Sequence, residues 1–195
     1  MTTITLWHGG RYLESQYKEI LSSKKGRWEH GPGLYLTTHY DTAYQYSKGG
    51  GKTYMVEVEL GNDIKDVLLN IDIVNEFVSR YVINSKKKNL LNDLYENMHR
   101  MNSMPHIKAD HVLNLIFNLD AITATKTKEL AHFLVENGVD YGTVNRFKGR
   151  DENVFVVYNR DKIKKVKSIS AKDVSLDQWE LPFIVQENKK PQFKI

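Results

Sequence analysis

The chain contains no cysteine among its 195 residues. It therefore has no disulfide, no thiolate nucleophile and no cysteine-ligated zinc site, which excludes several classes of secreted domain and of enzyme. No apolar run approaches the ~18 to 20 residues that a helix needs to cross a bilayer. Residues 1–6 lack the basic flank and the long apolar stretch of a secretory signal. These absences predict a cytoplasmic protein that makes no membrane contact.

The bulk composition is that of an ordinary globular domain. Hydrophobic residues make up 41% of the chain and charged residues 27%, and a chain of this length buries roughly 70% of its unfolded surface around one core. No internal repeat or low-complexity linker divides the sequence, so we expect residues 1–195 to form a single domain with an insertion. The net charge of +4 and the pI near 9.0 are compatible with a nucleic-acid partner but do not establish one.

The first third of the chain alternates strand and helix signals. Residues 4–8 and 53–60 alternate as strands do, while residues 12–22 and 42–48 have the composition and spacing of helices. Glycines and Pro32 predict a loop that leads into a third strand at residues 34–36. Asp41 is placed to cap the second helix, because its carboxylate can accept from the unpaired amides of the first turn.

The hydrophobic period changes in the middle of the chain. Between about residues 71 and 138, apolar residues recur at helical spacing and predict three or four helices packed as a unit. Residues 141–145, 153–158 and 163–169 are then predicted as strands, the second of them apolar enough to be central in a sheet. Strands at both ends with helices between them predict an α+β fold with a helical insertion at about 71–138.

Two motif-like segments do not carry a function. Residues 47–53 end in the Gly-Lys-Thr of a phosphate-binding loop, but Tyr46 occupies the leading glycine position and a strand is predicted where the helix must begin. His106 and His111 flank Asp110, but they are five residues apart and point to different faces of a helix. We therefore expect neither a nucleotide-binding loop nor a metal site.

Five segments in a fixed order carry the most informative pattern. They are Leu6-Trp7-His8-Gly9, Gly33-Leu34-Tyr35-Leu36, Tyr46, residues 54–62 and residues 154–163. Together they resemble the ADP-ribosyltransferases of the diphtheria-toxin and poly(ADP-ribose) polymerase type, whose hallmark is a histidine, a tyrosine and a glutamate on three separate strands. The resemblance covers residues 4–62 and about 139–169. It implies an ADP-ribosyltransferase-like split β-sheet core, with the intervening helices as an insertion that has no counterpart in the family.

The resemblance implies NAD+ as co-substrate and needs no metal. Tyr46 follows Tyr35 by eleven residues, where the family places the second ring of its nicotinamide clamp. Two tyrosine faces can hold the flat nicotinamide cation by stacking and cation–π attraction, worth about 0.5–2 kcal/mol per face. The backbone of Gly9 can approach the carboxamide closely because it has no side chain. The imidazole of His8 can hydrogen-bond a ribose hydroxyl and fix its angle.

The catalytic carboxylate is where the sequence departs from the family. Val154 stands at the expected glutamate position. Glu152 shares a strand face with Val154 because side chains repeat every second residue, and Asn153 faces the other way unless a bulge intervenes. Glu152 is therefore the first candidate for the carboxylate that stabilises the oxocarbenium-like sugar, and Asn153 the alternate.

The family's small hydroxyl residues are also replaced. Gly10 and Ala43 occupy places where a hydroxyl often binds nicotinamide. Thr42 or Thr37 can supply that hydroxyl instead, and the sequence does not decide between them.

The expected function is mono-ADP-ribosyl transfer to a macromolecule, because family members without the glutamate tend to transfer single units or to be inactive. The acceptor is a protein or a nucleic acid, and the compact, lysine-rich chain suits a bacterial or phage toxin or effector with an inhibitor or antitoxin partner. The alternative is an inactive NAD- or ADP-ribose-binding interaction module. A third possibility, NAD+-dependent removal of an RNA 2′-phosphate, would need more cationic anchors than Arg11 and Arg27 near the pocket.

Overall fold

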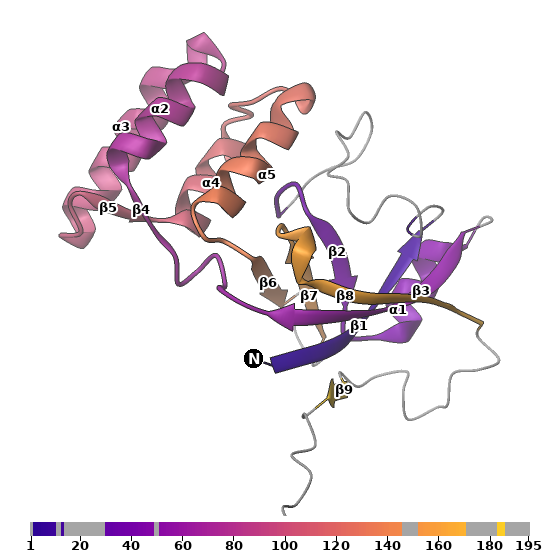
Figure 1. Ribbon diagram of the computed structural model, residues 1–195. Coiled ribbons are helices and arrows are strands. Elements are labelled where there is room, and N and C mark those ends of the chain that lie inside the picture. The colour runs from indigo at the N-terminus through magenta and orange to yellow at the C-terminus, as the bar shows by residue number, and fades with distance from the viewer. Residues whose placement is uncertain are drawn as a thin grey trace, which may run out of the picture.

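The computed structural model describes residues 2–10, 13, 30–48, 51–145, 152–170 and 183–185, and these residues form an α+β fold. The strands are β1 (Thr2–Gly10), β2 (Leu34–Thr37), β3 (Lys52–Leu60), β4 (Leu68–Asn70), β5 (His106–Lys108), β6 (Tyr141–Asn145), β7 (Asn153–Val157), β8 (Ile163–Ile169) and β9 (Phe183–Val185). The helices are α1 (Tyr40–Ser47), α2 (Ile71–Tyr81), α3 (Asn84–Met101), α4 (Ala109–Asn118) and α5 (Thr127–Glu136), with 3-10 turns η1 (Ala124–Lys126) and η2 (Arg160–Lys162). The helices α2 to α5 form a lobe beside the sheet, beyond β6 (Figure 1).

The main sheet is antiparallel in every described pair. Its strands follow the order β6-β7-β2-β1-β3-β8, and the short β9 pairs with the first half of β1. β1 pairs with β3 along all nine of its residues, whereas β1 and β2 share the single paired position Trp7 opposite Thr37. The sheet is therefore weakest at the seam between β1 and β2.

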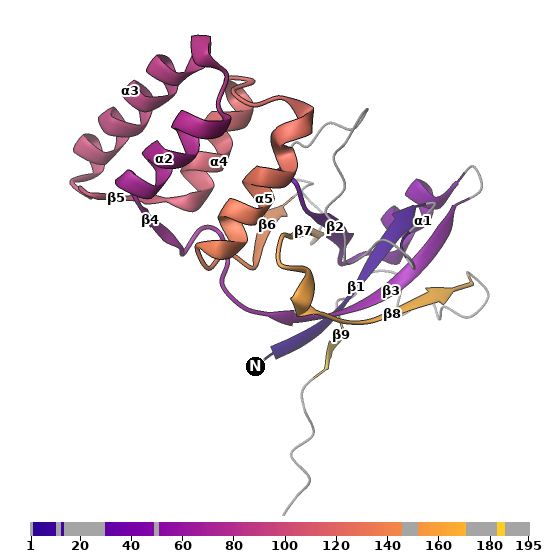
Figure 2. The same cartoon turned by 45° about the horizontal axis from the view of Figure 1, so that its top comes forward.

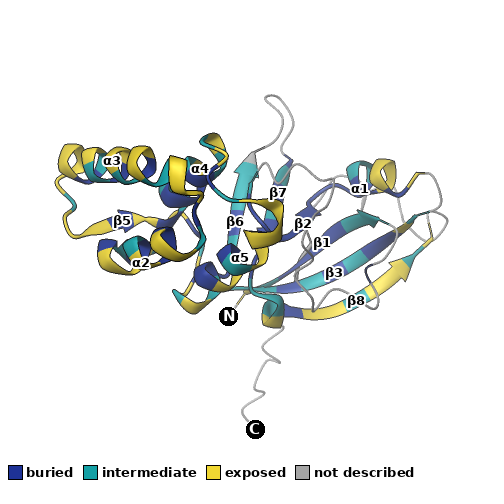
Figure 3. Ribbon diagram, turned by 90° about the horizontal axis from the view of Figure 1, so that it is seen from above, coloured by how far each residue is buried: buried dark blue, intermediate teal, exposed yellow. Residues whose placement is uncertain are grey.

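The predicted strands are confirmed where the alternation is clear. β6 and β8 have the bounds that the sequence predicts, and β7 lies between β6 and β2 as its apolar run indicated. β8 is the exposed edge of the sheet, with most of its residues open to solvent (Figure 3). Its lysines occupy these exposed positions, which keeps an otherwise free edge polar.

Helix α1 begins two residues before the predicted start. Tyr40 is fully buried against the ring of Trp7, with 5.0 Å between the ring centroids in an edge-to-face arrangement, and this contact extends the helix towards β2. The predicted cap at Asp41 is wrong, because the cap position is His39 and no side chain caps the helix. The carboxylate of Asp41 accepts instead from the amide of Thr42, the next residue in the first turn, at 2.8 Å.

The structure has four α-helices where the hydrophobic spacing predicted three or four. These helices, α2 to α5, are amphipathic, and the side chain of Asn70 caps α2 by accepting from the amide of Asp72 at 2.8 Å. The small sheet of β4 and β5, which closes the base of this lobe, is an addition that the sequence pattern did not predict. Figure 2 shows the helices stacked beside one another, with α5 nearest to β6 and η2.

The lobe and the main sheet share one hydrophobic core. Leu94, Ile116 and Leu134 from three helices belong to the same buried cluster as Val156 and Tyr158 from the central part of the sheet. The insertion is therefore part of the structure that supports β7. None of the described helices combines the length and the apolar character that crossing a bilayer requires.

Some predictions fall outside the described residues. The helix at residues 12–22 and most of the loop at residues 24–33 belong to this group, as do the fragments around Arg11 and Arg27.

We predict that Leu134→Ala lowers the free energy of unfolding by about 2–5 kcal/mol, because Leu134 has no exposed surface and its removal leaves a cavity in the shared core. Urea denaturation followed by circular dichroism measures this change. Leu68→Ala is the matched control, since the Leu68 side chain is 58% exposed. Equal losses in the two variants would contradict the assignment of the core.

Candidate functional site

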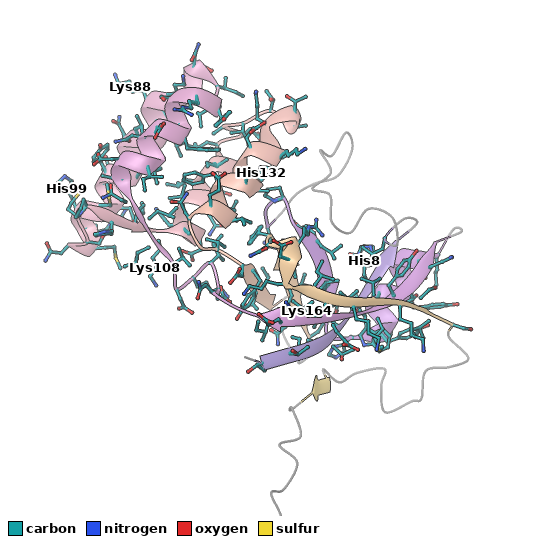
Figure 4. The ribbon with its side chains drawn as sticks, in the orientation of Figure 1. His8, Lys88, His99, Lys108, His132 and Lys164 are labelled. Atoms are coloured by element: carbon teal, nitrogen blue, oxygen red, sulfur yellow. The ribbon has the colours of Figure 1, made fainter. Side chains whose placement is uncertain are left out.

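A pocket of about 280 Å³ opens beside α1, on the part of the sheet where β1, β2 and β7 lie together. Its lining residues are Trp7, His8, Gly9, His30, Tyr35, Leu36, Thr37, Thr42, Ala43, Tyr46, Val144 and Val154. The predicted donor-binding residues from three separate elements are all among them. Figure 4 shows His8 within the sheet, apart from the helical lobe.

The two faces of the sheet contribute differently to this pocket. Trp7 pairs with Thr37 and Thr37 pairs with Val154, so these side chains share the face that α1 covers. His8 alternates to the other face, where its ring lies 6.2 Å from the ring of Tyr54. It reaches the pocket at the seam, where its Nδ1 lies 2.9 Å from the backbone oxygen of Tyr35. The imidazole thus bridges β1 and β2 next to their single paired position.

This hydrogen bond fixes the tautomer of His8. A carbonyl oxygen only accepts, so Nδ1 donates its proton to Tyr35 and Nε2 of the neutral ring keeps its lone pair. Burial lowers the pKa of His8 below its usual 6.5, and the positive charge of Arg160 lowers it further, although the bond to Tyr35 opposes both effects. The ring is therefore a neutral hydrogen-bond acceptor near pH 7.

Tyr35 and Tyr46 both line the pocket, one from β2 and one from α1. The Tyr35 hydroxyl is anchored at its far end, because it accepts from the amide of His30 at 3.0 Å and donates to the carbonyl of Gly31 at 2.9 Å. Tyr46 is 56% exposed, at the rim of the cavity. The pocket therefore has a fixed aromatic ring at Tyr35 and a solvent-exposed aromatic ring at Tyr46.

Gly9 is required by the approach of α1. A Cβ at this position would lie 1.7 Å from the backbone oxygen of Ala43 and 3.0 Å from Cβ of Tyr46. The backbone of α1 at Ala43 leaves no room for even one methyl group. The absence of a side chain at Gly9 thus sets the distance between β1 and the helix that carries Thr42 and Tyr46.

The two threonine candidates differ in how their hydroxyls are used. Thr37 donates to Oε1 of Glu152 at 2.7 Å and accepts from the amide of His39 at 3.1 Å, so its hydroxyl is occupied within the protein. Thr42 also lines the pocket, and only its backbone amide is engaged in a described hydrogen bond. Of the two, Thr42 is the one able to offer a hydroxyl to a ligand.

Glu152 is fully buried behind the pocket wall. It precedes β7 on the same face as Val154, and its Oε1 accepts the Thr37 hydroxyl, whereas Oε2 is buried with no hydrogen-bond partner in the described structure. Val154 lines the pocket, and Glu152 does not. A buried carboxylate oxygen without a partner is costly, which is typical of a group retained for a function.

Asn153 is not brought to the pocket. The pairing of β6 and β7 is regular through Asn145 and Asn153, without a bulge, so the Asn153 side chain alternates to the face away from Val154. Its backbone accepts from the amide of Thr38 and donates to the Thr38 hydroxyl, both at 3.1 Å. Asn153 therefore fastens the end of β2 to β7.

The sequence analysis missed His30. It lines the pocket directly before Gly31, whose backbone φ of 98° lies in the left-handed region that favours glycine. A histidine before a glycine-proline-glycine turn that enters a tyrosine-bearing strand is the only signal that could have pointed to it. Within the described residues, no group of three histidine or acidic side chains is arranged to hold a metal ion.

The chain matches no protein-family model, no curated protein and no solved structure.

We predict that the His8 imidazole titrates below pH 6.5 and stays protonated at Nδ1 when neutral. The unfolded chain then binds the proton more readily than the folded chain, so this contribution to the free energy of unfolding is present above about pH 6.5 and lost as the pH falls towards the lower folded pKa. NMR titration of the imidazole and urea denaturation at several pH values measure both effects. His99→Gln, on exposed α3, is the control that should keep the pH dependence, and an equally steep dependence in His8→Gln would contradict the assignment.

We predict that Gly9→Ala shifts α1 and lowers stability more than Gly10→Ala does. A methyl group at Gly9 meets backbone atoms of Ala43, whereas one at Gly10 meets the His8 side chain, with Nε2 at 2.7 Å. Urea midpoints and amide chemical shifts of α1 residues in the two variants give the comparison. Unchanged amide chemical shifts of the α1 residues in Gly9→Ala would show that the packing of the helix is not limited by this position.

Proposed function

We propose that the pocket binds the nicotinamide end of NAD+ and that the protein transfers single ADP-ribose units to a macromolecular acceptor. The observation that carries the proposal is the convergence of Tyr35, Tyr46, Gly9, Thr42 and His8 on one cavity from three elements. A flat cation needs aromatic faces, a carboxamide needs nearby polar groups, and a ribose needs a hydrogen-bond acceptor. The pocket offers each of these within one volume.

The strand arrangement also supports the resemblance to ADP-ribosyltransferases. β1, β2 and β7 carry the histidine, the tyrosine and the glutamate candidate, and they are neighbours in the order β7-β2-β1. The short pairing between β1 and β2 is compatible with the split β-sheet core expected for this family. The proposed family membership therefore rests on strand order as well as on residue types.

Each site residue has a proposed role in donor binding. The Tyr35 and Tyr46 rings stack on nicotinamide, the Thr42 hydroxyl and the Gly9 backbone hydrogen-bond its carboxamide, and Nε2 of His8 accepts from a ribose hydroxyl. The fixed tautomer of His8 suits this role, because a neutral Nε2 accepts without adding positive charge beside a cationic ligand.

The proposed reaction breaks the bond between the ribose C1′ and the nicotinamide nitrogen. The bonding pair leaves with nicotinamide, the sugar becomes oxocarbenium-like, and an acceptor nucleophile forms the new bond to C1′ and releases its proton. In this proposal the Glu152 carboxylate stabilises the cationic sugar from behind the pocket wall, and the Thr37 hydroxyl, which lines the pocket, donates to its Oε1.

A second candidate function is NAD+ binding without transfer. Two observations favour it: Val154 presents an apolar side chain to the pocket, and Glu152 has no exposed surface. In this case the protein is an interaction module that recognises NAD+ or ADP-ribose and leaves the glycosidic bond intact.

The remaining assignments follow from the proposed transfer. The acceptor is a protein, RNA or DNA, and the basic chain is compatible with either polymer. A role as a bacterial or phage toxin in the cytoplasm, controlled by an inhibitor protein, is part of the same proposal.

The test uses NAD+ labelled in its adenylate part, incubated with the protein and a cell lysate whose protein and nucleic-acid fractions are then separated. We expect label in one fraction, a loss of about 100-fold or more in Glu152→Gln, and unchanged transfer in the control Glu96→Gln on exposed α3. NAD+ affinity should persist in Glu152→Gln and fall about two- to thirtyfold in Tyr46→Ala. Binding without label in either fraction would select the interaction module, and no NAD+ binding at all would refute both functions.

A further inference from the structure

Arg160 is a partly buried cation without a counter-charge in the described structure. It belongs to η2, which joins the central strand β7 to the edge strand β8, and its Nε is buried with no hydrogen-bond partner. Within the described residues no carboxylate lies within ion-pair distance of its guanidinium. Burial lowers the pKa of Arg160 to about 10, and no neighbouring acid opposes this change.

The lysines that follow along the chain are paired. Lys162 lies 3.5 Å from Glu59 and 3.7 Å from Asp140, and Lys164 lies 3.2 Å from Glu59. Arg160 therefore differs from the neighbouring cations in lacking a carboxylate partner. Buried charges in proteins are normally paired, so an unpaired guanidinium indicates a partner that arrives as a ligand.

Arg160 lines a second cavity, next to the candidate site. This second pocket, of about 200 Å³, lies between α5 and η2 and is lined by Arg160, Asn159, Tyr158 and residues of α5. The Tyr158 hydroxyl donates to the carbonyl of His30 at 2.7 Å, and His30 lines the first pocket. The Tyr158 hydroxyl thus links the linings of the two cavities, and the positive charge of Arg160 contributes to the lowered pKa of His8.

We propose that Arg160 forms a phosphate-binding site, and that the diphosphate of NAD+ is the group it binds. The inference rests on the proposed function for the identity of the ligand, but its chemistry rests on Arg160 alone. A guanidinium offers donors in a planar fork that matches two phosphate oxygens. A diphosphate links the two nucleosides of NAD+, so the proposal places it at the cation that lies beside the nicotinamide pocket.

Three further titratable groups line the second pocket. His132 and Glu136 come from exposed positions of α5, and Asp161 follows Arg160 in η2. Figure 4 shows His132 on α5, in the helical lobe. Neither carboxylate pairs with Arg160 in the described structure, so both repel an incoming anion without neutralising the site. The Glu136 side chain therefore weakens phosphate binding, and its removal should strengthen it.

The test compares the affinities of Arg160→Met, Arg160→Lys and the wild-type chain by isothermal titration calorimetry. The probes are NAD+, nicotinamide riboside, inorganic pyrophosphate and a short oligonucleotide. In Arg160→Met we expect NAD+ and pyrophosphate to bind about ten- to a hundredfold more weakly, with nicotinamide riboside unchanged, because only the phosphates lose a charge-assisted partner. Arg160→Lys should bind NAD+ and pyrophosphate more tightly than Arg160→Met and more weakly than wild type. Glu136→Gln should bind both ligands more tightly than wild type.

Two controls separate this site from general charge and from folding. Lys167→Gln removes one positive charge from exposed β8 and should leave every affinity unchanged. Arg160→Met should raise the urea midpoint of the ligand-free protein, because an apolar side chain of similar length removes an unpaired, partly buried charge. A raised midpoint with reduced pyrophosphate binding indicates a residue kept for its ligand.

The outcomes distinguish the two proposals. Equal NAD+ and pyrophosphate affinities in wild type and Arg160→Met would overturn the phosphate site and leave the proposed function standing. Pyrophosphate binding that depends on Arg160, in a protein that does not bind NAD+, would support the site and overturn the proposed function. If only the oligonucleotide loses affinity in Arg160→Met, the phosphate site stands and its phosphate belongs to a nucleic acid, which overturns the assignment to NAD+.

Discussion

The hydrogen bond from His8 to the backbone of Tyr35 joins β1 and β2, the neighbouring strands of the sheet that share only one paired position. Beyond this position an imidazole replaces the backbone pairing. The pocket opens beside this seam and is lined by residues of both strands. The same hydrogen bond also fixes the tautomer of the ring, so one contact serves both the stability of the sheet and the chemistry of the pocket.

The candidate site is built from close backbone approach more than from long side chains. Gly9 allows α1 to lie directly on β1, and the anchored hydroxyl of Tyr35 holds its ring in place. Glu152 stands behind this wall with one oxygen bonded to Thr37 and the other unpaired. Rigid positioning combined with an unsatisfied buried group is typical of functional sites, where local cost is accepted for a specific geometry.

Sequence patterns predicted the strands well because burial on one face imposes a period of two. They predicted the start of α1 less well, because the contact between Tyr40 and Trp7 is made between residues 33 positions apart in the chain. The three-residue strands β4 and β5 are too short to show a period. The placement of Tyr35, Tyr46 and Gly9 in one cavity follows the order of the motif. The unpaired state of Arg160 was not predictable, since an arginine beside an aspartate has the pattern of an ordinary surface turn.

The bond between Thr37 and Glu152 joins residues 115 positions apart. The elements β1, β2 and α1, which line the pocket, are synthesised early. β7, which completes the wall of the pocket, is synthesised only after the helices α2 to α5. Contacts of such long range form late, because the intervening chain must first lose its freedom. We therefore expect a nascent chain to remain without a finished pocket until β7 has left the ribosome.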